Sequence, residues 1–193
     1  MKKLLITGFE PFGGEQINPS WQAVLLLNDK IGDYNLTKML IPVVFEQSAK
    51  LVIEKANEIC PDAILCIGQA GGRSSITPEF VGINLRHATI PDNNGNNPQD
   101  QPVIKNGENA YFSTLPMRKI VESINSAGIP CNASYSAGAY VCNDLIYTLL
   151  HHFKNTNTRV GFIHVPYCNE QNKEPSMAIS EIVKALTIAV ENM

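Results

Sequence analysis

The segment Ala63-Ile64-Leu65-Cys66-Ile67 is apolar at every position, without alternation between apolar and polar side chains. A strand with this pattern is buried on both faces, which is typical of parallel sheets covered by helices. Similar runs predict further strands at residues 3–7, 36–41 and 159–164, and weaker runs predict strands at residues 81–85 and 131–134. These runs decide the fold class because helical patterns separate most of them.

Helical periodicity predicts helices at residues 19–27, 46–59, 116–127, 142–153 and 176–191. Asn18-Pro19 marks the start of the first helix, with Asn as N-cap and Pro at the first helical position. Strands alternating with helices predict an α/β fold with a mostly parallel sheet, covered on both faces. Ligands of such sheets bind beyond the carboxyl ends of the strands. Residues 90–107, rich in Pro, Asn, Asp and Gly, are predicted to form a long surface loop, either a lid or a mobile segment.

The bulk properties exclude several classes of protein. A length of 193 residues predicts one domain, residues 1–193, and a net charge of −3 argues against nucleic acid or an anionic membrane as partner. No apolar run approaches the ~20 residues needed to span a bilayer, and the run at the N-terminus is too short for a signal peptide. Five cysteines without paired spacing indicate a reducing cytoplasm, and the absence of CxxC and HxxxH predicts no metal site.

A cysteine stands at a predicted helix start in Ser136-Ala137-Gly138-Ala139-Tyr140-Val141-Cys142-Asn143. Free backbone N–H groups and the helix dipole favour a thiolate there, so we expect the pKa of Cys142 to fall below its usual ~8.5. The same N–H groups can stabilise an oxyanion, which predicts a cysteine nucleophile. The alternative, a buried structural thiol, stays open on spacing alone. A structural thiol is the expected role of the other four cysteines, Cys60, Cys66, Cys131 and Cys168. Cys168 lies in a polar segment, where we expect it to be exposed.

Two glycine-containing segments follow predicted strands. Gly8 and Gly13 have the spacing of a P-loop, but the required Lys-Ser/Thr is missing, so a phosphate site is not expected. Phe9 and Phe12 between these glycines are predicted to wall an apolar pocket, with ordinary core packing as the alternative. Residues 68–73 lack the order of a dinucleotide-binding motif, but their glycines permit close backbone approach.

His164 ends the last predicted strand and precedes Val165-Pro166, so it should project at the carboxyl edge of the sheet. There it would share an edge with Cys142 and act as its base, whereas the alternative is a hydrogen-bonded core histidine. The other histidines, His87, His151 and His152, lie in less suitable places. From its sequence position alone, Glu79 is expected to be an ordinary solvated carboxylate.

Taken together, these segments resemble the pyroglutamyl peptidase I family, also called pyrrolidone-carboxylate peptidases, which are cysteine exopeptidases. The resemblance covers almost the whole chain and rests on ordered motifs at residues 7–13, 18–21, 68–73, 76–79, 90–93, 110–116, 136–138, 141–143 and 161–167. It implies a three-layer α/β/α sandwich around a twisted, mostly parallel mixed sheet. It implies a catalytic triad of Cys142, His164 and Glu79, and a substrate pocket formed by Phe9, Phe12, Gln69 and Val141.

The resemblance also implies a reaction, the removal of N-terminal pyroglutamate (5-oxoproline) from peptides. The Cys142 thiolate would attack the pyroglutamyl carbonyl, and His164 would protonate the leaving amine and later activate water against the thioester. Glu79 would hold the imidazole in one tautomer. No metal and no cofactor are expected. A cytoplasmic homotetramer is expected, acting on peptides with N-terminal pyroglutamate.

The chain departs from the family pattern at several positions. His87-Ala88-Thr89 replaces the usual Asp-Ala-Arg, whose arginine is thought to assist the oxyanion site, and Arg86 is a candidate to compensate. Phe80 and Asp144 also stand where other residues are common. Two alternatives stay open, the first because of the changes at residues 87–89 and the second because folds of this kind host several chemistries. The first is a catalytically weakened protein that binds pyroglutamyl or lactam groups, and the second is a different α/β enzyme, for example a nucleoside-cleaving one.

Overall fold

The computed structural model describes residues 1–193 and contains a six-stranded sheet in the order β2-β3-β1-β4-β8-β5. The inner strands are parallel, whereas the short strands β2 and β5 pair antiparallel at the two edges. The strands are β1 (Lys2–Phe9), β2 (Lys30–Ile31), β3 (Tyr34–Ile41), β4 (Ala63–Gln69), β5 (Thr77–Glu79) and β8 (Arg159–Val165). The sheet is therefore mixed but mostly parallel, as predicted.

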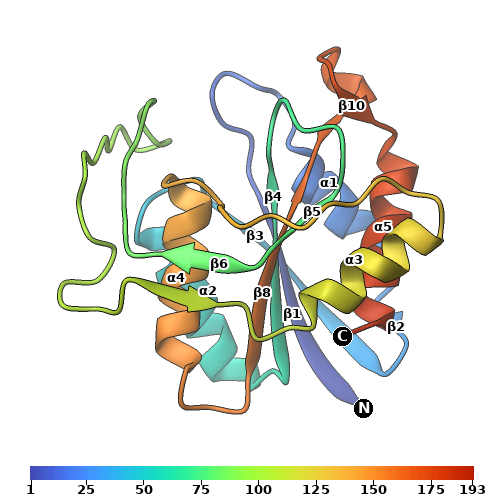
Figure 1. The fold of residues 1–193 in the computed structure, drawn as a ribbon, viewed down its shortest axis with the longest axis horizontal. Coiled ribbons are helices and arrows are strands. Elements are labelled where there is room, and N and C mark those ends of the chain that lie inside the picture. The colour runs from blue at the N-terminus through green and yellow to red at the C-terminus, as the bar shows by residue number, and fades with distance from the viewer.

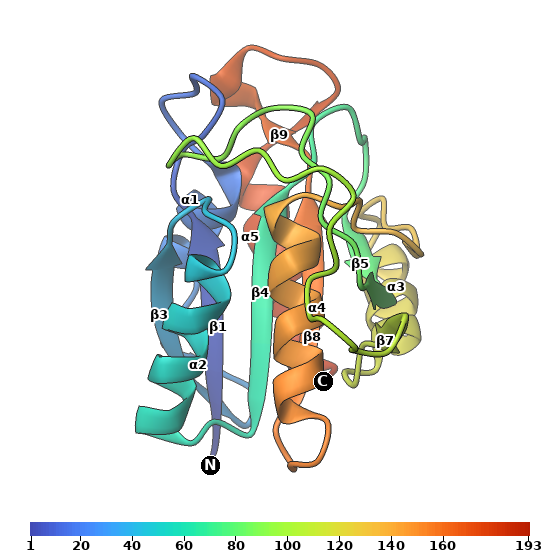
Figure 2. The same ribbon diagram turned by 90° about the vertical axis from the view of Figure 1, so that its left-hand side faces the viewer.

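The helices cover both faces of this sheet, so the molecule has three layers (Figures 1 and 2). Helices α2 and α4 lie on one face, and α1, α3 and α5 lie on the other. Their bounds are α1 (Pro19–Leu26), α2 (Gln47–Ile59), α3 (Met117–Ser126), α4 (Val141–Phe153) and α5 (Ile179–Glu191). This arrangement confirms the predicted α/β sandwich.

Two small sheets complete the structure. Strands β6 (Val81–Ile83) and β7 (Ala110–Phe112) pair antiparallel, and β9 (Tyr167–Cys168) pairs parallel with β10 (Ser176–Met177). A short 3-10 helix, Asn169–Gln171, follows β9. No helix has both the length and the hydropathy to cross a bilayer.

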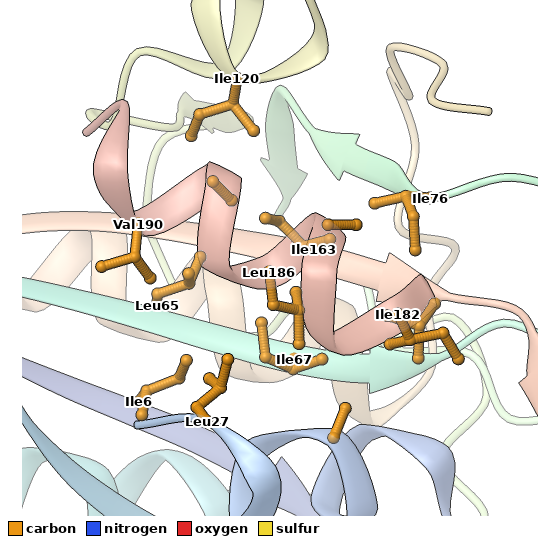
Figure 3. Close-up of a cluster of buried hydrophobic side chains, with 14 of the residues drawn as sticks. Ile6, Leu27, Leu65, Ile67, Ile76, Ile120, Ile163, Ile182, Leu186 and Val190 are labelled. Atoms are coloured by element: carbon orange, nitrogen blue, oxygen red, sulfur yellow. The ribbon is translucent and has the colours of Figure 1, made fainter. Parts of the chain in front are cut away.

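The hydrophobic core consists of two clusters separated by the sheet. Side chains alternate between the faces of a strand, so Leu65 and Ile67 of β4 pack against Leu186 of α5, as Figure 3 shows. Ile64 and Cys66 of the same strand point to the opposite face, into the cluster beneath α2 and α4. Both sides of β4 are thus buried, which explains why its sequence is apolar at every position.

Most predicted elements are present within a few residues of their expected bounds. Asn18 caps α1 as predicted, because its side-chain oxygen accepts the N–H of Ser20. The predicted helix at residues 176–191 begins only at Ile179, since Ser176 and Met177 form β10. The expectation that Cys168 is exposed is wrong, because it lies in β9 with 1% of its surface accessible.

Two expectations about strands need correction, and the short strands β2, β5, β7, β9 and β10 were not expected. The weak run at residues 81–85 forms β6, but outside the main sheet. The predicted strand at residues 131–134 is wrong, since this segment makes only isolated bridges, from Cys131 to Ile76 and from Ser134 to Glu79. Strand β5 was not expected, because three residues containing a proline carry little strand signal.

The long loop at residues 90–107 contains no helix and no regular strand, as predicted. Asp92 anchors its first part, since its carboxylate accepts backbone N–H groups from Phe45, Asn94 and Asn96. Gln101 forms an isolated antiparallel bridge with Arg86 further along. The loop is therefore held to the rest of the chain at two points, one just before α2 and one just after β6.

The contact between β1 and α1 yields a prediction about stability. A Cβ atom at Gly8 would lie 2.7 Å from Trp21 Cα and 2.8 Å from Trp21 N, backbone atoms that cannot rotate away. We predict that Gly8→Ala lowers the free energy of unfolding by about 1–3 kcal/mol, because β1 or α1 must shift. Urea denaturation followed by circular dichroism measures the change.

Gly161→Ala is the matched control. Its added methyl group would meet Met117 Cε and Leu115 Cδ1, which are the far ends of flexible side chains. The loss at this position should therefore be smaller, and an equal or larger loss would contradict the account.

Candidate active site

Three chemically active side chains come together at the carboxyl edge of the sheet. His164 comes from the end of β8, Glu79 from the end of β5, and Cys142 from the first turn of α4. Parallel strands β4 and β8 end at this edge, near which α4 begins (Figure 2). It is the edge at which sheets of this class bind ligands.

The pairing of β5 with β8 brings Glu79 to His164. Thr77 pairs with His164 and Glu79 pairs with Phe162, so Glu79 and His164 are diagonal neighbours on one face of the sheet. His164 Nδ1 lies 2.7 Å from Glu79 Oε1, and both side chains are buried. An ionised carboxylate only accepts hydrogen bonds, so the proton of the neutral ring sits on Nδ1. His164 Nε2 is then free to act as a base.

A glycine makes room for the Cys142 thiol beside His164. Gly68 of β4 is the register partner of His164, and a Cβ atom at Gly68 would lie 3.1 Å from Cys142 Sγ and 2.7 Å from Phe162 Cζ. Neighbouring strands are about 4.8 Å apart. The sulfur therefore lies over the strand position next to the imidazole, on the same face, and any side chain at position 68 would displace it.

The start of α4 leaves backbone donors free around this sulfur. Tyr140 is the N-cap, with extended backbone and no capping hydrogen bond from its side chain. The first intrahelical bond runs from Asp144 N to Tyr140 O, at 3.1 Å, so the N–H groups of residues 141–143 precede it. Unpaired N–H groups at a helix start are suited to holding a developing negative charge.

Cys142 and His164 both line a cavity of about 210 Å³. Among the residues predicted to form a substrate pocket, Phe9, Phe12 and Gln69 line this cavity, whereas Val141 is fully buried and does not. Other lining residues were not singled out from the sequence; they are Asn18, Val43, Ala70, Arg73, Ala137, Gly138 and Tyr140. Most of the wall is apolar or aromatic, which suits a small, uncharged ring.

Cys142 is half-buried where it lines the cavity, and this partial burial sets the charge state of its thiol. Burial raises the pKa of Cys142 to about 12, and the negative charge of Glu79 and the nearby Cys66 act in the same direction. The expectation of a lowered thiol pKa at the helix start is therefore wrong for the free protein. Burial and the neighbouring groups Glu79 and Cys66 set this direction, whereas only the position of Cys142 at a helix start was visible in the sequence.

Burial also keeps the imidazole neutral. It lowers the pKa of His164, although the hydrogen bond and charge of Glu79 oppose the change. Burial alone would raise the pKa of the Glu79 carboxyl, but His164, Ser134 and Arg73 together hold it below its ordinary value. The free site thus contains a thiol, a neutral imidazole and a carboxylate.

The substituted positions near the site lie outside the cavity. Thr89 is exposed and does not line it. Arg86, the candidate to compensate for Thr89, cannot do so because its guanidinium pairs with Asp144 and Glu46. Asp144 also accepts the N–H of Glu46, at 2.8 Å, so it fastens the start of α2 to α4. Backbone N–H groups at the start of α4 remain as candidate oxyanion donors.

This arrangement is suited to acyl transfer by a nucleophile and a base. The thiol and the imidazole line one cavity, a carboxylate orients the imidazole, and backbone donors lie beside the thiol. No three His, Cys, Asp or Glu side chains of the chain converge in a way that fits a metal ion.

Comparison with known proteins identifies relatives along the full length of the chain. The family model described as pyroglutamyl peptidase matches residues 2–193. Pyrrolidone-carboxylate peptidases of Bacillus thuringiensis and Bacillus cereus are 46% identical over 198 residues, covering 99% of this chain and 92% of each relative.

Solved structures agree with this match. Pyroglutamyl peptidase I of Bacillus amyloliquefaciens is 45% identical with a TM-score of 0.95, covering 100% of this chain and 96% of that chain. Pyrrolidone carboxyl peptidase of Thermococcus litoralis is 37% identical with a TM-score of 0.95, covering 99% of this chain and 92% of that chain.

The charge state of the site predicts how Cys142 reacts with an alkylating agent. Because burial raises its pKa to about 12, the thiolate fraction grows about tenfold per pH unit throughout the neutral range. Alkylation by iodoacetamide, measured by mass spectrometry of the peptide that contains residue 142, should rise steadily between about pH 7 and pH 10.

Cys142→Ser is the control, in which this peptide should stay unmodified. A rate of alkylation that is already constant at neutral pH would show a stable thiolate and would contradict the account.

Proposed function

The chain belongs to the pyroglutamyl peptidase family, and on that premise we propose that Cys142, His164 and Glu79 carry out its reaction. The protein is a cysteine peptidase that removes N-terminal pyroglutamate from peptides. One observation carries the assignment of residues: His164 Nδ1 is held 2.7 Å from Glu79 Oε1 while the same imidazole and Cys142 line one cavity.

The cavity supports recognition of the pyroglutamyl ring. Phe9 and Phe12 offer apolar walls, and Gln69 offers a carboxamide. Gln69 Oε1 accepts a hydrogen bond from Gln171 Nε2 at 2.9 Å, which leaves the amide N–H groups of Gln69 as donors for a lactam oxygen. An N-terminus closed into a lactam carries no ammonium charge, so it enters an apolar cavity without the cost of burying a charge.

Formation of the acyl-enzyme begins from the neutral pair. As Cys142 Sγ attacks the pyroglutamyl carbonyl carbon, His164 Nε2 takes the thiol proton, and the carbonyl oxygen gains negative charge. N–H groups in the first turn of α4 stabilise this oxygen, and ionised Glu79 stabilises the imidazolium through Nδ1. The proton transfer is needed because the resting thiol, with its pKa near 12, is protonated at neutral pH.

The amine then leaves, and water hydrolyses the acyl-enzyme, with His164 transferring the proton in each step. The imidazolium of His164 gives its proton to the nitrogen of the scissile amide, whose C–N bond breaks, and the shortened peptide leaves with a free amino group. His164 then takes a proton from water, whose oxygen attacks the thioester carbon. The C–S bond breaks, the imidazolium returns its proton to Cys142 Sγ, and pyroglutamate is released.

We also propose that the protein is a homotetramer of the cytoplasm. The sequence resemblance supports both the assembly and the location. Several large apolar side chains are available for contact between subunits, with Phe112 74% exposed, Tyr135 63% exposed and Leu26 60% exposed. Light scattering behind size exclusion tests the assembly, since a tetramer has four times the mass of the chain.

Substitutions in the proposed triad should abolish release of a chromogenic amine from a pyroglutamyl amide. We predict that Cys142→Ala lowers kcat/KM by about 10³-fold or more because no acyl-enzyme can form, and that Glu79→Gln lowers it by about 10²-fold or more. The rate of amine release measures both, with circular dichroism to verify folding.

A prolyl amide, which carries a charged ring nitrogen, is the matched control substrate and should not be cleaved. Equal rates for Cys142→Ala and the wild type would overturn the nucleophile assignment. Tight binding of a pyroglutamyl ligand by the wild type without hydrolysis would favour the alternative of a lactam-binding protein.

A further inference from the structure

Arg73 makes a close contact with the buried carboxylate of the site. It follows β4 in the glycine-rich segment at residues 68–73, and Arg73 Nη1 donates to Glu79 Oε1 at 2.7 Å. The same nitrogen donates to Thr77 Oγ1 at 2.7 Å, and Arg73 Nη2 donates to the carbonyl oxygen of Ser136 at 3.2 Å. One guanidinium thus links the end of β5 with the segment that leads into α4.

Arg73 is one of three side chains that stabilise the Glu79 carboxylate, together with His164 and Ser134. Glu79 Oε1 accepts hydrogen bonds from both Arg73 and His164, whereas its Oε2 is buried and has no partner. The Glu79 side chain has no exposed surface, and Arg73 is the only Arg or Lys that forms an ion pair with it. A buried carboxylate with one bare oxygen is costly to keep ionised unless a cation lies beside it.

We propose that Arg73 is a positioning residue of the reaction, which acts through Glu79 by holding its carboxylate ionised while keeping His164 neutral. This inference rests on the proposed function of the triad. The two 2.7 Å bonds to one oxygen carry it, because both donors compete for the same negative charge. With its charge partly offset by Arg73, Glu79 orients the imidazole without drawing a proton onto it.

The charged groups that face His164 agree with this role. The Glu79 carboxylate faces it from β5 and the Arg73 guanidinium from the segment after β4, whereas Cys142 faces it from α4 as a titratable but neutral thiol. Burial is the main cause that lowers the pKa of His164, Glu79 opposes it, and Arg73 adds to the lowering. Removing the Arg73 cation would therefore let the Glu79–His164 pair keep an extra proton to higher pH, whichever of the two groups holds it.

The test compares a variant that removes the charge with one that keeps it. The acid limb of kcat/KM reports protonation of the base in the free enzyme. We expect Arg73→Gln to move this limb to higher pH by about one unit and to lower kcat at the optimum by about tenfold, whereas Arg73→Lys should leave the limb close to its wild-type position. Pyroglutamyl amide hydrolysis as a function of pH measures both variants.

The results for the Arg73 variants distinguish a failure of this inference from a failure of the proposed triad. If the wild type is active and Cys142→Ala is inactive, but Arg73→Gln keeps the wild-type acid limb, this inference is overturned while the triad stands. An equal shift in Arg73→Lys and Arg73→Gln would also overturn it, because the shift would then not follow the charge.

Chemical rescue gives a second test if Arg73→Gln fails to fold. The Arg73 side chain is 32% exposed and lines the cavity, so a guanidinium ion can reach its place in Arg73→Ala. Added guanidinium chloride, at concentrations too low to denature, should restore part of the rate and return the acid limb toward the wild-type position. Absence of rescue in a folded Arg73→Ala variant would contradict the role proposed for Arg73.

Discussion

The hydrogen bond between His164 Nδ1 and Glu79 Oε1 is the interaction on which the site depends. It exists because β5 joins the parallel sheet antiparallel to β8, which places the carboxylate diagonally from the ring on one face. The bond determines which nitrogen of the ring carries the proton, and therefore which nitrogen can serve as a base. The proposed chemistry of Cys142 requires that this nitrogen be Nε2, on the side away from Glu79.

Burial is the second constraint, and it acts on both members of the proposed nucleophile and base pair. It raises the pKa of the Cys142 thiol and lowers that of the His164 imidazole, so both resting groups are neutral. The ion pair forms only as the sulfur attacks, when the oxyanion can use N–H groups at the start of α4. A cation at Arg73 is consistent with this balance, because it shares the oxygen of Glu79 that would otherwise favour the imidazolium.

The main sheet and the helices could be predicted from local sequence, because continuous apolar strands and amphipathic helices carry their own periodicity. The pairing of Glu79 with His164 could not, because residues 79 and 164 meet only through long-range pairing by a three-residue strand. Only the family resemblance singled out Glu79. The partial burial of Cys142 was likewise invisible. So was the position of Arg86, whose guanidinium turns toward Asp144 and Glu46 instead of the cavity.

Nitrogen NMR of protein labelled with ¹⁵N-histidine tests most directly which nitrogen of the His164 ring carries the proton. At neutral pH in the absence of substrate, His164, assigned by comparison with His164→Asn, should show a protonated Nδ1 and an unprotonated Nε2. Resonances of a ring protonated at both nitrogens, or at Nε2 alone, would show that Glu79 does not set the tautomer in a neutral pair, and would contradict the account.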